Sequence, residues 1–264
     1  MNGVLGVALQ SMQHDMKRVE RVGVNMANSL TPGYKREIVV EHPFSNMVAD
    51  ALQTPNASDA KFFQTASLSD PGAVGLDFVT DRQVGTLKPT GEKLDLALAS
   101  EAYFQVSTAH GLAYTRQGAF RMDARGRLVT AQGDPVMGKS GEIRLNSNVP
   151  SIDANGNVYD TAQVNQQTGL PEAAIAQLNI VQFEQPGFLQ KNVDGLWVAA
   201  EEAGMSEAKN PQVMQAHLEN SNVSSMQEMV TLMQAMRHLE SMQKVAQGYD
   251  EMLGTAIRKL GEVS

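Results

Sequence analysis

Residues 1–36, MNGVLGVALQSMQHDMKRVERVGVNMANSLTPGYKR, contain a heptad pattern that ends in a turn. Apolar or small residues recur at alternating intervals of four and three positions, while charged and amide residues occupy the opposite face. The series consists of Leu5, Leu9, Met12, Met16, Val19, Gly23, Met26 and Leu30. We expect one long helix that stops before Pro32, because proline lacks the backbone donor that a helix requires.

The helix is followed by Thr31-Pro32-Gly33-Tyr34, which fits a type II turn with proline at its second position and glycine at its third. We expect this turn, together with Asn28, to set the direction in which the chain leaves the helix.

A second heptad series runs through the C-terminal region. Ser225-Met226-Gln227-Glu228 has the form of a capping box, so a helix is predicted from there, with Asn222 and Ser225 as caps. The series consists of Leu239, Met242, Ala246, Tyr249, Leu253, Ala256 and Leu260, and Met229, Met233 and Met236 extend the apolar stripe toward the start. A lone amphipathic helix is marginal in water, so each stripe must pack against the other helix, the middle of the chain or another copy.

The middle of the chain predicts β-structure. Short alternating runs such as 103–106, 112–116, 119–122 and 127–130 are separated by turn sequences rich in Gly, Asp and Asn. Their spacing of roughly eight to twelve residues is typical of a sandwich or small barrel. The predicted fold class is therefore α+β: long N- and C-terminal helices that pair as a coiled coil, and a central all-β domain.

Five regions follow from these patterns. We predict an N-terminal coiled-coil helix and turn over 1–36, an irregular linker over 37–78, the β domain over 79–200, a return linker over 201–221, and a C-terminal coiled-coil helix over 222–264.

Composition excludes several classes of function. The formal net charge is −8, and without a cluster of Lys and Arg the chain is not expected to bind nucleic acid or an anionic membrane. There is no cysteine, which excludes thiol catalysis, thiolate metal sites and disulfides. We recognise neither a cleavable secretion signal nor an apolar run long enough to span a bilayer.

The order of motifs resembles the flagellar basal-body rod and hook protein family. Ala27-Asn28-Ser29-Leu30-Thr31-Pro32-Gly33-Tyr34-Lys35-Arg36 is similar to the family's N-terminal signature. Tyr114-Thr115-Arg116-Gln117-Gly118-Ala119-Phe120 and 126–130 are similar to its central motifs, and Asn222-Val223 precedes its C-terminal helix pattern. Ser100-Glu101-Ala102 stands where relatives usually carry Gly-x-Gly. Of the branches, the proximal rod protein of F type is the most similar and the distal rod protein of G type is second.

The resemblance implies a structural subunit that polymerises into the axial tube of the flagellar motor. Its partners would be other copies, neighbouring rod proteins, possible ring proteins and the export apparatus. It would lie in the periplasm-spanning rod, after export without a cleaved signal. The seam residues given above would carry assembly. The family motif residues with structural roles would be Asn28, Thr31, Pro32, Gly33, Tyr34, Tyr114, Thr115, Arg116, Gly118, Phe120, Asn222 and Val223.

We predict no enzymatic activity, no cofactor and no metal site. His14, His42, His110, His217 and His238 form no ligand pattern. Residues 133–140, GDPVMGKS, match a phosphate-binding loop in spacing, but an alternating strand pattern follows where that loop needs a helix. The alternative from a different class is a monomeric binding module, in which the terminal helices clamp each other and present the β domain to a ligand.

Overall fold

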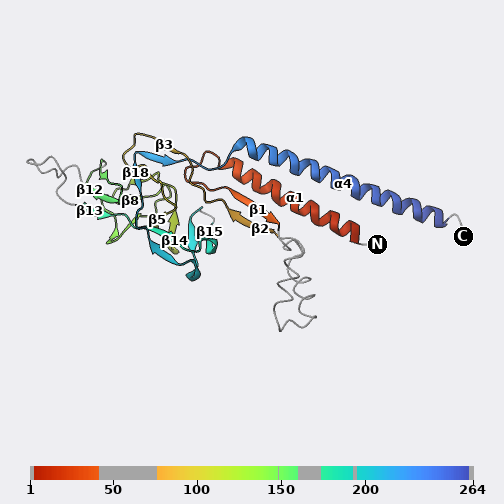
Figure 1. Cartoon of the computed structure of the whole chain (residues 1–264), viewed down its shortest axis with the longest axis horizontal. Helices are drawn as coiled ribbons and strands as arrows, with labels where there is room; N and C mark the ends of the chain where they lie inside the picture. The colour runs from red at the N-terminus through yellow and green to blue at the C-terminus, as the bar shows by residue number, and fades with distance from the viewer. Residues whose placement is uncertain (1–2, 42–75, 148, 160–173, 193–194, 262–264) are drawn as a thin grey trace, which may run out of the picture. The chain divides into compact units, whose positions relative to one another are not determined.

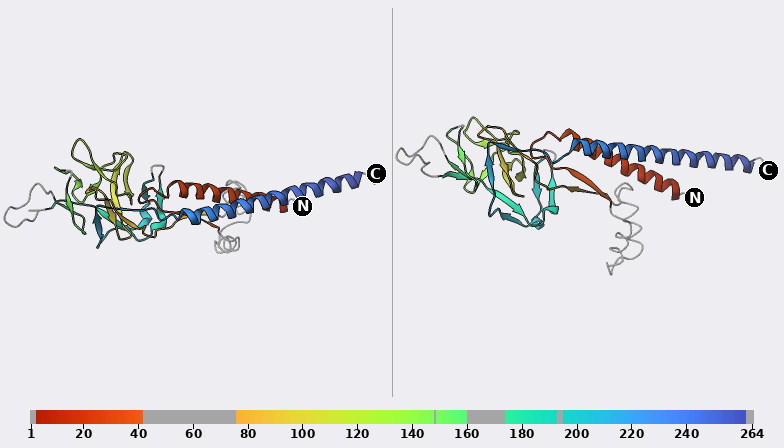
Figure 2. Two further views of the ribbon diagram at one scale, coloured as in Figure 1. Left: turned by 90° about the horizontal axis from the view of Figure 1, so that it is seen from above. Right: turned by 45° about the horizontal axis from the view of Figure 1, so that its top comes forward.

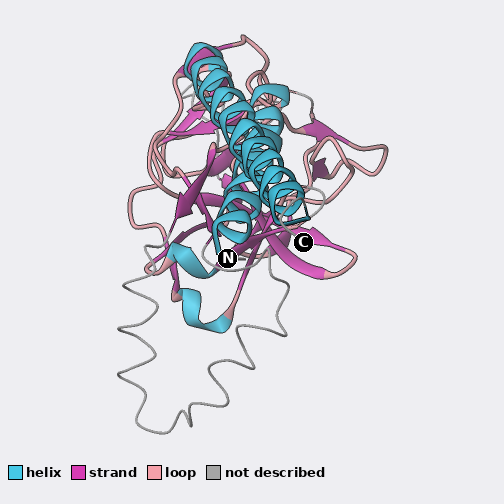
Figure 3. Ribbon diagram, turned by 90° about the vertical axis from the view of Figure 1, so that its right-hand side faces the viewer, coloured by secondary structure: helices cyan, strands magenta, loops and turns pink. Residues whose placement is uncertain are grey.

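The computed structural model describes residues 3–41, 76–147, 149–159, 174–192 and 195–261, which are mostly β-structure (Figure 1, Figure 3). The chain divides into two compact units. The helical unit comprises residues 1–27, 37–80 and 223–264, and the β unit comprises residues 28–36 and 81–222.

In the helical unit, α1 (Gly3–Ala27) and α4 (Ser225–Gly261) lie side by side, as both views of Figure 2 show. The strands β1 (Glu37–Glu41) and β2 (Leu76–Thr80) form an antiparallel pair. The Asn25 side chain holds β1 to α1, because its Nδ2 donates to the Glu37 carbonyl at 2.9 Å and its Oδ1 accepts from the Glu37 N–H at 3.1 Å. Arg21 adds an ion pair to the Glu37 carboxylate at 2.5 Å.

The prediction of an α+β fold built on a coiled coil is wrong. The described chain is mostly β-structure, with a half-barrel sheet and two α-helices. The contacts that join these helices include polar ones: Asn25 Nδ2 lies 3.2 Å from Glu228 Oε2, and His238 Nδ1 lies 2.6 Å from Asp15 Oδ2. Asp15, Asn25 and Glu228 are all buried, so polar side chains occupy positions where a coiled coil needs interdigitated apolar ones.

Much of each predicted seam faces away from the partner helix. Leu9, Met16, Leu30, Met229, Met233 and Met236 are exposed, Met12, Val19, Met26, Leu239, Met242 and Tyr249 are half-buried, and the side chains of Leu5, Leu253 and Leu260 are not among those described. The physical reason is that an apolar period shows that a helix has an apolar face, but not what that face packs against.

The β unit is made of many short strands. These are β3 (Leu87–Pro89), β4 (Leu96–Leu98), β5 (Tyr103–Thr108), β6 (Gly111–Thr115), β7 (Arg121–Met122), β8 (Leu128–Val129), β9 (Met137–Gly138), β10 (Gly141–Glu142), β11 (Ser151–Ile152), β12 (Asn157–Tyr159), β13 (Ala174–Gln177), β14 (Ile180–Phe183), β15 (Leu189–Lys191), β16 (Trp197–Ala199), β17 (Met205–Glu207), β18 (Val213–Gln215) and β19 (His217–Glu219), with 3-10 turns η1 (Pro186–Phe188) and η2 (Glu201–Ala203). The predicted strands within 103–106, 112–116, 119–122 and 127–130 are confirmed.

Six strands form the largest sheet, in the order β15-β16-β6-β5-β14-β17, and every pairing in it is antiparallel. A three-stranded sheet has the order β11-β12-β13, while β18-β4 and β19-β3 form separate pairs. The pairs β18-β4 and β19-β3 place residues 213–219, where the chain leaves the β unit, beside residues 87–98 near its start.

The central strand β5 has apolar residues buried on both of its faces. Phe104 and Val106 enter the main core, where Phe104 meets Phe120 edge to face at 5.2 Å. Tyr103 points into a second cluster with Phe183 and Trp197. Burial on both faces explains why Tyr103 and Phe104 are both apolar, although the sequence was interpreted as an alternating run with one buried face.

One five-residue turn recurs in the β unit, at 123–127, 130–134 and 153–157. In each copy the first N–H donates to the fifth carbonyl, and the glycine at position four donates its N–H to the first carbonyl. The first side chain, Asp or Thr, accepts a hydrogen bond from the fifth N–H. The glycines adopt φ of 77°, 101° and 81°, a conformation that favours glycine. The prediction that turn sequences rich in Gly, Asp and Asn separate the strands is confirmed at these three places.

Asp153 shows how such a turn depends on charge. Burial opposes ionisation of this carboxylate, but hydrogen bonds from Asn157, Asn155 and Tyr159 outweigh burial and hold its pKa below the usual value. A carboxylate with a lowered pKa in the folded state contributes stability above its unfolded pKa of about 3.9. That contribution is lost as the pH falls through the lower, folded pKa.

We therefore expect Asp153→Asn to lower the melting temperature at pH 7, and expect the difference from the wild type to shrink as the pH falls below about 4. Thermal unfolding at pH 7 and at pH 3 measures both effects. Glu202→Gln, at an exposed position in η2, serves as the control and should leave both temperatures unchanged. A difference between Asp153→Asn and wild type that stays the same at both pH values would contradict this role.

Candidate assembly junction

Two segments far apart in the sequence meet on the β unit. One is the turn that follows α1, and the other is the end of β19 with the residues after it. The place where they meet, here called the junction, is formed by Gly33, Lys35, Arg116, Glu219 and Asn222. All five belong to the β unit.

Gly33 brings the two segments into backbone contact. Its N–H donates to the Glu219 carbonyl at 2.8 Å, and the Tyr34 N–H donates to the Thr31 carbonyl at 3.2 Å. The φ of Gly33 is +69°, so the predicted type II turn is confirmed. A Cβ at this position would lie 2.6 Å from the carbonyl carbon and oxygen of Arg116, so only glycine fits.

A buried ionic cluster lies beneath this turn. Glu219 Oε1 accepts from Lys35 Nζ at 2.6 Å and from the Gly85 N–H at 2.8 Å, while its Oε2 accepts from Arg116 Nε at 2.9 Å. The side chains of Lys35, Arg116 and Glu219 are 3, 3 and 1% exposed. The Glu219 carboxylate, at the end of β19, therefore binds both Lys35, which follows the turn after α1, and Arg116 of the central motif 114–120.

Every polar atom of this cluster has a partner. Arg116 also donates to the carbonyls of Ser100, Ala102 and Leu98. Burial lowers the pKa of Lys35, and the charge of Glu219 works against that lowering. Buried charges are tolerated when they are paired and hydrogen-bonded, so this cluster is stable only while all of its members are present.

Asn222 closes the other side of the junction. Its Oδ1 accepts from the Arg36 N–H at 2.7 Å, and its Nδ2 donates to the carbonyls of Asp81 and Gln83. These contacts differ from the predicted role as a cap of α4. The Asn222 side chain therefore hydrogen-bonds backbone groups of residues 36, 81 and 83, which lie far from it in the sequence. No local sequence pattern reveals such a long-range contact.

Aromatic residues cover the outer side of the junction. Lys191 Nζ lies 4.0 Å from the ring centroid of the buried Tyr34 and 5.6 Å from that of Trp197. Such distances are favourable for cation–π contacts. The motif predicted Tyr34 to be important, but it gave no reason to select Lys191.

The other central motif residues build the surrounding core. Thr115 and Phe120 are buried, and Tyr114 is buried with its hydroxyl 3.0 Å from Met205 Sδ. Gly118 accepts from the Leu96 N–H through its carbonyl at 3.0 Å, and a Cβ on it would lie 1.5 Å from the Leu96 carbonyl oxygen.

The remaining motif residues flank the turn. Thr31 Oγ1 donates to Asn28 Oδ1 at 3.2 Å, and the Thr31 N–H donates to the Asn28 carbonyl at 3.1 Å. Pro32 and Val223 are half-buried. Sequence reasoning missed Lys35, Gly85 and Glu219 as members of one cluster. For Lys35 and Glu219 the available signal was a charged residue inside an otherwise apolar or turn segment, and Lys35 also lies within the family-like signature 27–36; no signal selected Gly85.

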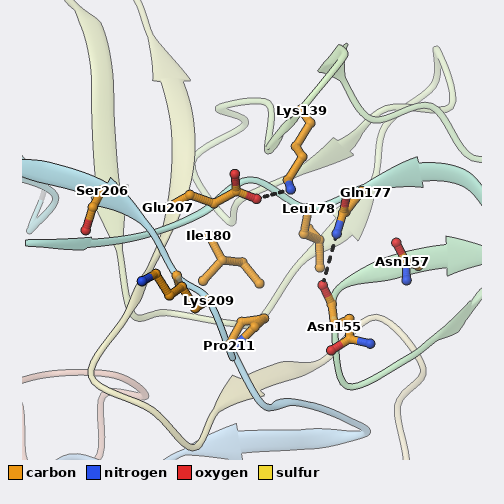
Figure 4. Close-up of a pocket in the computed structure, with 11 residues that line it drawn as sticks. Lys139, Asn155, Asn157, Gln177, Leu178, Ile180, Ser206, Glu207, Lys209 and Pro211 are labelled. Carbon is orange, nitrogen blue, oxygen red and sulfur yellow. Dashed lines mark hydrogen bonds and ion pairs between the residues drawn. The ribbon is translucent and has the colours of Figure 1, made fainter.

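A separate hollow of about 700 Å³ opens beside β17, as Figure 4 shows. Lys139, the lysine of the phosphate-loop-like sequence, lies at its edge and forms an ion pair with Glu207. The lysine is followed by strand β10 and not by a helix, so no helix N-terminus faces the hollow. The lining also includes the side chains of Asn155 and Gln177, and no histidine is among the lining residues.

The described residues contain no group of three or more His, Cys, Asp and Glu side chains placed to hold a metal ion. Of the helices in the described ranges, neither combines the length and the apolar character needed to cross a membrane.

Comparison with known proteins gives consistent matches. Residues 97–160 match the model of the flagellar hook protein FlgE/F/G D1 domain, and residues 214–259 match that of the flagellar basal body rod FlgEFG protein C-terminal region. The chain is 29% identical to the flagellar basal-body rod protein FlgF of Rhizobium meliloti, over 97% of both chains. It is also 29% identical to the rod protein FlgG of Agrobacterium fabrum, over 97% of this chain and 98% of that one, and 25% identical to FlgF of Caulobacter vibrioides over the full length of both.

Proposed function

The chain belongs to the flagellar basal-body rod protein family of F and G types, and on that premise we propose that it polymerises through an apolar stripe on α4. It is a structural subunit of the rod and lies at the flagellar basal body. The observation that supports polymerisation is a row of exposed methionines on α4, here called the outer stripe. It is formed by Met226, Met229, Met233 and Met236, which are 76, 46, 54 and 44% exposed.

Exposed apolar groups of this size on one helix face favour an interaction surface. Methionine suits a surface that must pack against several differently placed neighbours, because its side chain is flexible and polarisable. Head-to-tail contacts between copies produce an open helical assembly when the rotation between subunits does not close. The exposed Leu9 and Met16 of α1 extend the available apolar area of the helical unit.

We propose the proximal, F-type position in the rod. The sequences Lys93-Leu94-Asp95-Leu96-Ala97-Leu98 and Asn25-Met26-Ala27-Asn28 support this assignment, while the equal identity to an FlgF and an FlgG does not separate the two. Complementation tests the assignment: the gene should restore motility to a host that lacks its F-type protein and not to one that lacks its G-type protein. The opposite result would assign it to the distal rod.

We propose that the chain is exported to the rod by the flagellar export apparatus, without cleavage of a signal peptide. Other copies, neighbouring rod proteins and ring proteins are the proposed partners in the periplasm-spanning part. The five-region division remains a proposal, in which 37–78 and 201–221 connect the helices to the β domain. Residues 42–75 of the first lie outside the described residues, and its two ends form β1 and β2. Residues 201–221 also contain β17, β18 and β19, which pair with β14, β4 and β3 of the β unit.

The assembly test is Met233→Asp. A charge in the middle of the outer stripe should weaken association between copies at least about tenfold, because burial of one large apolar side chain stabilises by roughly 1.5–3 kcal/mol. Sedimentation of the purified chain and swimming of the host measure the effect. Gln234→Asp, at the neighbouring exposed position, adds the same charge outside the stripe and should assemble normally. Normal assembly of Met233→Asp would refute the stripe as an interface.

A monomeric binding module is the second candidate. It is favoured by the contacts of Asn25 with Glu228 and of Asp15 with His238, which join the helices within one chain. Limited proteolysis of the dilute chain distinguishes the polymerising rod subunit from the monomeric binding module. Rapid loss of both helices with retention of a β core would favour ordering by assembly, whereas resistance of the whole chain would favour the module.

A further inference from the structure

Two polar contacts join α1 to α4, and both belong to the same alignment of the helices. Asn25 Nδ2 donates to Glu228 Oε2 at 3.2 Å, and His238 Nδ1 lies 2.6 Å from Asp15 Oδ2. Asp15 and Asn25 are ten residues apart on α1, and Glu228 and His238 are ten residues apart on α4. The helices run antiparallel, as Figure 2 shows, so both contacts form together at one position of α1 along α4.

Three of these four side chains are buried. The exposed fractions are 4% for Asp15, 1% for Asn25 and 1% for Glu228, while the side chain of His238 is 50% exposed and reaches Asp15 from the solvent side. A buried carboxylate or amide is tolerated when it has a hydrogen-bond partner and is costly without one. Each contact therefore penalises any arrangement of the two helices that would break it.

The apolar residues alone leave the alignment of the two helices open. α4 has 37 residues and α1 has 25, so α1 could move seven positions toward the end of α4 and still lie against helix over its whole length. Ala235, Met242 and Tyr249, which follow Glu228 at intervals of seven, are buried or half-buried. The moved helix would therefore meet a similar apolar surface about 10 Å further along, at 1.5 Å per residue.

That movement would break both polar contacts. Asn25 would lie opposite Ala235 and Asp15 opposite Val245, and neither alanine nor valine has a side-chain group that forms hydrogen bonds. Asp15 would then be a buried carboxylate without the imidazole that it now contacts. Movement by seven positions in the other direction would carry the end of α1 past Ser225, where α4 begins.

We propose that Asp15, Asn25 and Glu228 fix the register of α1 along α4. Selection of one alignment, at some cost in stability, is the best-attested role of buried polar groups between helices. Asn25 also binds both backbone groups of Glu37, so β1 is held to the helix at the same place. One register gives every copy the same helical surface, which repeated identical contacts in an assembly require.

Distances between two spin labels test this role, and the absence of cysteine lets the labels be placed freely. Glu20→Cys on α1 and Gln247→Cys on α4 put them at exposed positions. Pulsed electron paramagnetic resonance is recorded on the dilute chain, mixed with excess unlabelled chain so that only distances within one molecule contribute. The labelled chain with no other change should give one distance.

Asp15→Leu combined with Glu228→Leu should add a second, shorter distance. It arises because a shift of seven residues brings the labels about 10 Å closer along the helix axis. Circular dichroism should show unchanged helix content, because leucine forms helix well and both substitutions add apolar contacts between the helices. A role in stability alone would lower the helix content or the melting temperature without producing a second distance.

Two control variants accompany this measurement. Asp15→Asn combined with Glu228→Gln keeps an acceptor oxygen at both positions and should keep the single distance. Glu240→Leu combined with Glu251→Leu removes two exposed carboxylates from α4 and should also keep it.

Four results would overturn the proposal. The first is a single, unchanged distance in the variant with leucine at positions 15 and 228, because apolar packing or the turn after α1 would then fix the register. The second is a loss of helix content in that variant, and the third is a second distance in either control. The fourth is the lack of a defined distance in the labelled chain with no other change. Because the measurement is made within single dilute chains, failure of the proposed rod function would leave it valid.

Discussion

Glu219→Gln is expected to lower the free energy of unfolding by about 3–5 kcal/mol, because it leaves two buried cations without their counter-charge. Glu219 is the single carboxylate between Lys35 and Arg116, and both of its oxygens accept two hydrogen bonds or ion-pair contacts. Glutamine has the same shape but places an N–H₂ group where one of the cations now donates. Chemical denaturation of the purified chain, followed by circular dichroism, measures the loss.

The exposed pair of Lys139 and Glu207 provides the comparison. The side chains of Lys139 and Glu207 are 39 and 58% exposed, so solvent screens their interaction. Glu207→Gln should therefore cost less than about 1 kcal/mol. If Glu219→Gln costs no more than Glu207→Gln, the junction is not held together by its buried charges.

Gly118→Ala is the second change with a large expected effect. An added Cβ would lie 1.5 Å from the Leu96 carbonyl oxygen and 2.7 Å from its carbon, which are backbone atoms that cannot rotate away. Strand β4 would have to move, with loss of the hydrogen bond between the Leu96 N–H and the Gly118 carbonyl. We expect destabilisation of more than about 3 kcal/mol, beyond ordinary overpacking, measured as the fall in melting temperature.

The same substitution at Gly248 should have the opposite sign. Gly248 lies within α4, and nothing stands within 4 Å of the Cβ that alanine would add. Alanine there should stabilise the helix by about 0.5–1 kcal/mol, because glycine is the more costly residue in a helix interior. A well-folded Gly118→Ala chain with an unchanged melting temperature would show that β4 does not pass so close to this glycine.

Local features of this protein could be predicted from its sequence because each depends on neighbouring residues. The turn at Thr31–Tyr34 requires proline and glycine at fixed positions, and the turn at 153–157 requires an acceptor side chain and a glycine three residues later. The β5 segment reads as a strand from its own residues. The ordered motifs also resembled the flagellar rod and hook protein family, and the matches to FlgF and FlgG agree with that resemblance.

The prediction of a coiled coil was wrong because heptad spacing does not show which residues meet between two helices. Heptad spacing in 5–30 and 239–260 showed that each helix has an apolar face, yet the faces in contact carry Asp15, Asn25 and Glu228. Buried polar residues at a helix contact follow no sequence period, so their partners cannot be read from spacing alone.

The order of residues was enough to reveal the resemblance to flagellar rod proteins and to predict the two amphipathic helices, the turns and the β-rich middle, whose local structure arises from contacts a few residues apart. The three-dimensional packing was needed to show that Lys35, Arg116 and Glu219 share one buried cluster across 184 positions of sequence. It was also needed to show which apolar faces stay open to solvent. A buried charge is stable only when an opposite charge lies next to it, and whether one does depends on how strands far apart in the sequence pair.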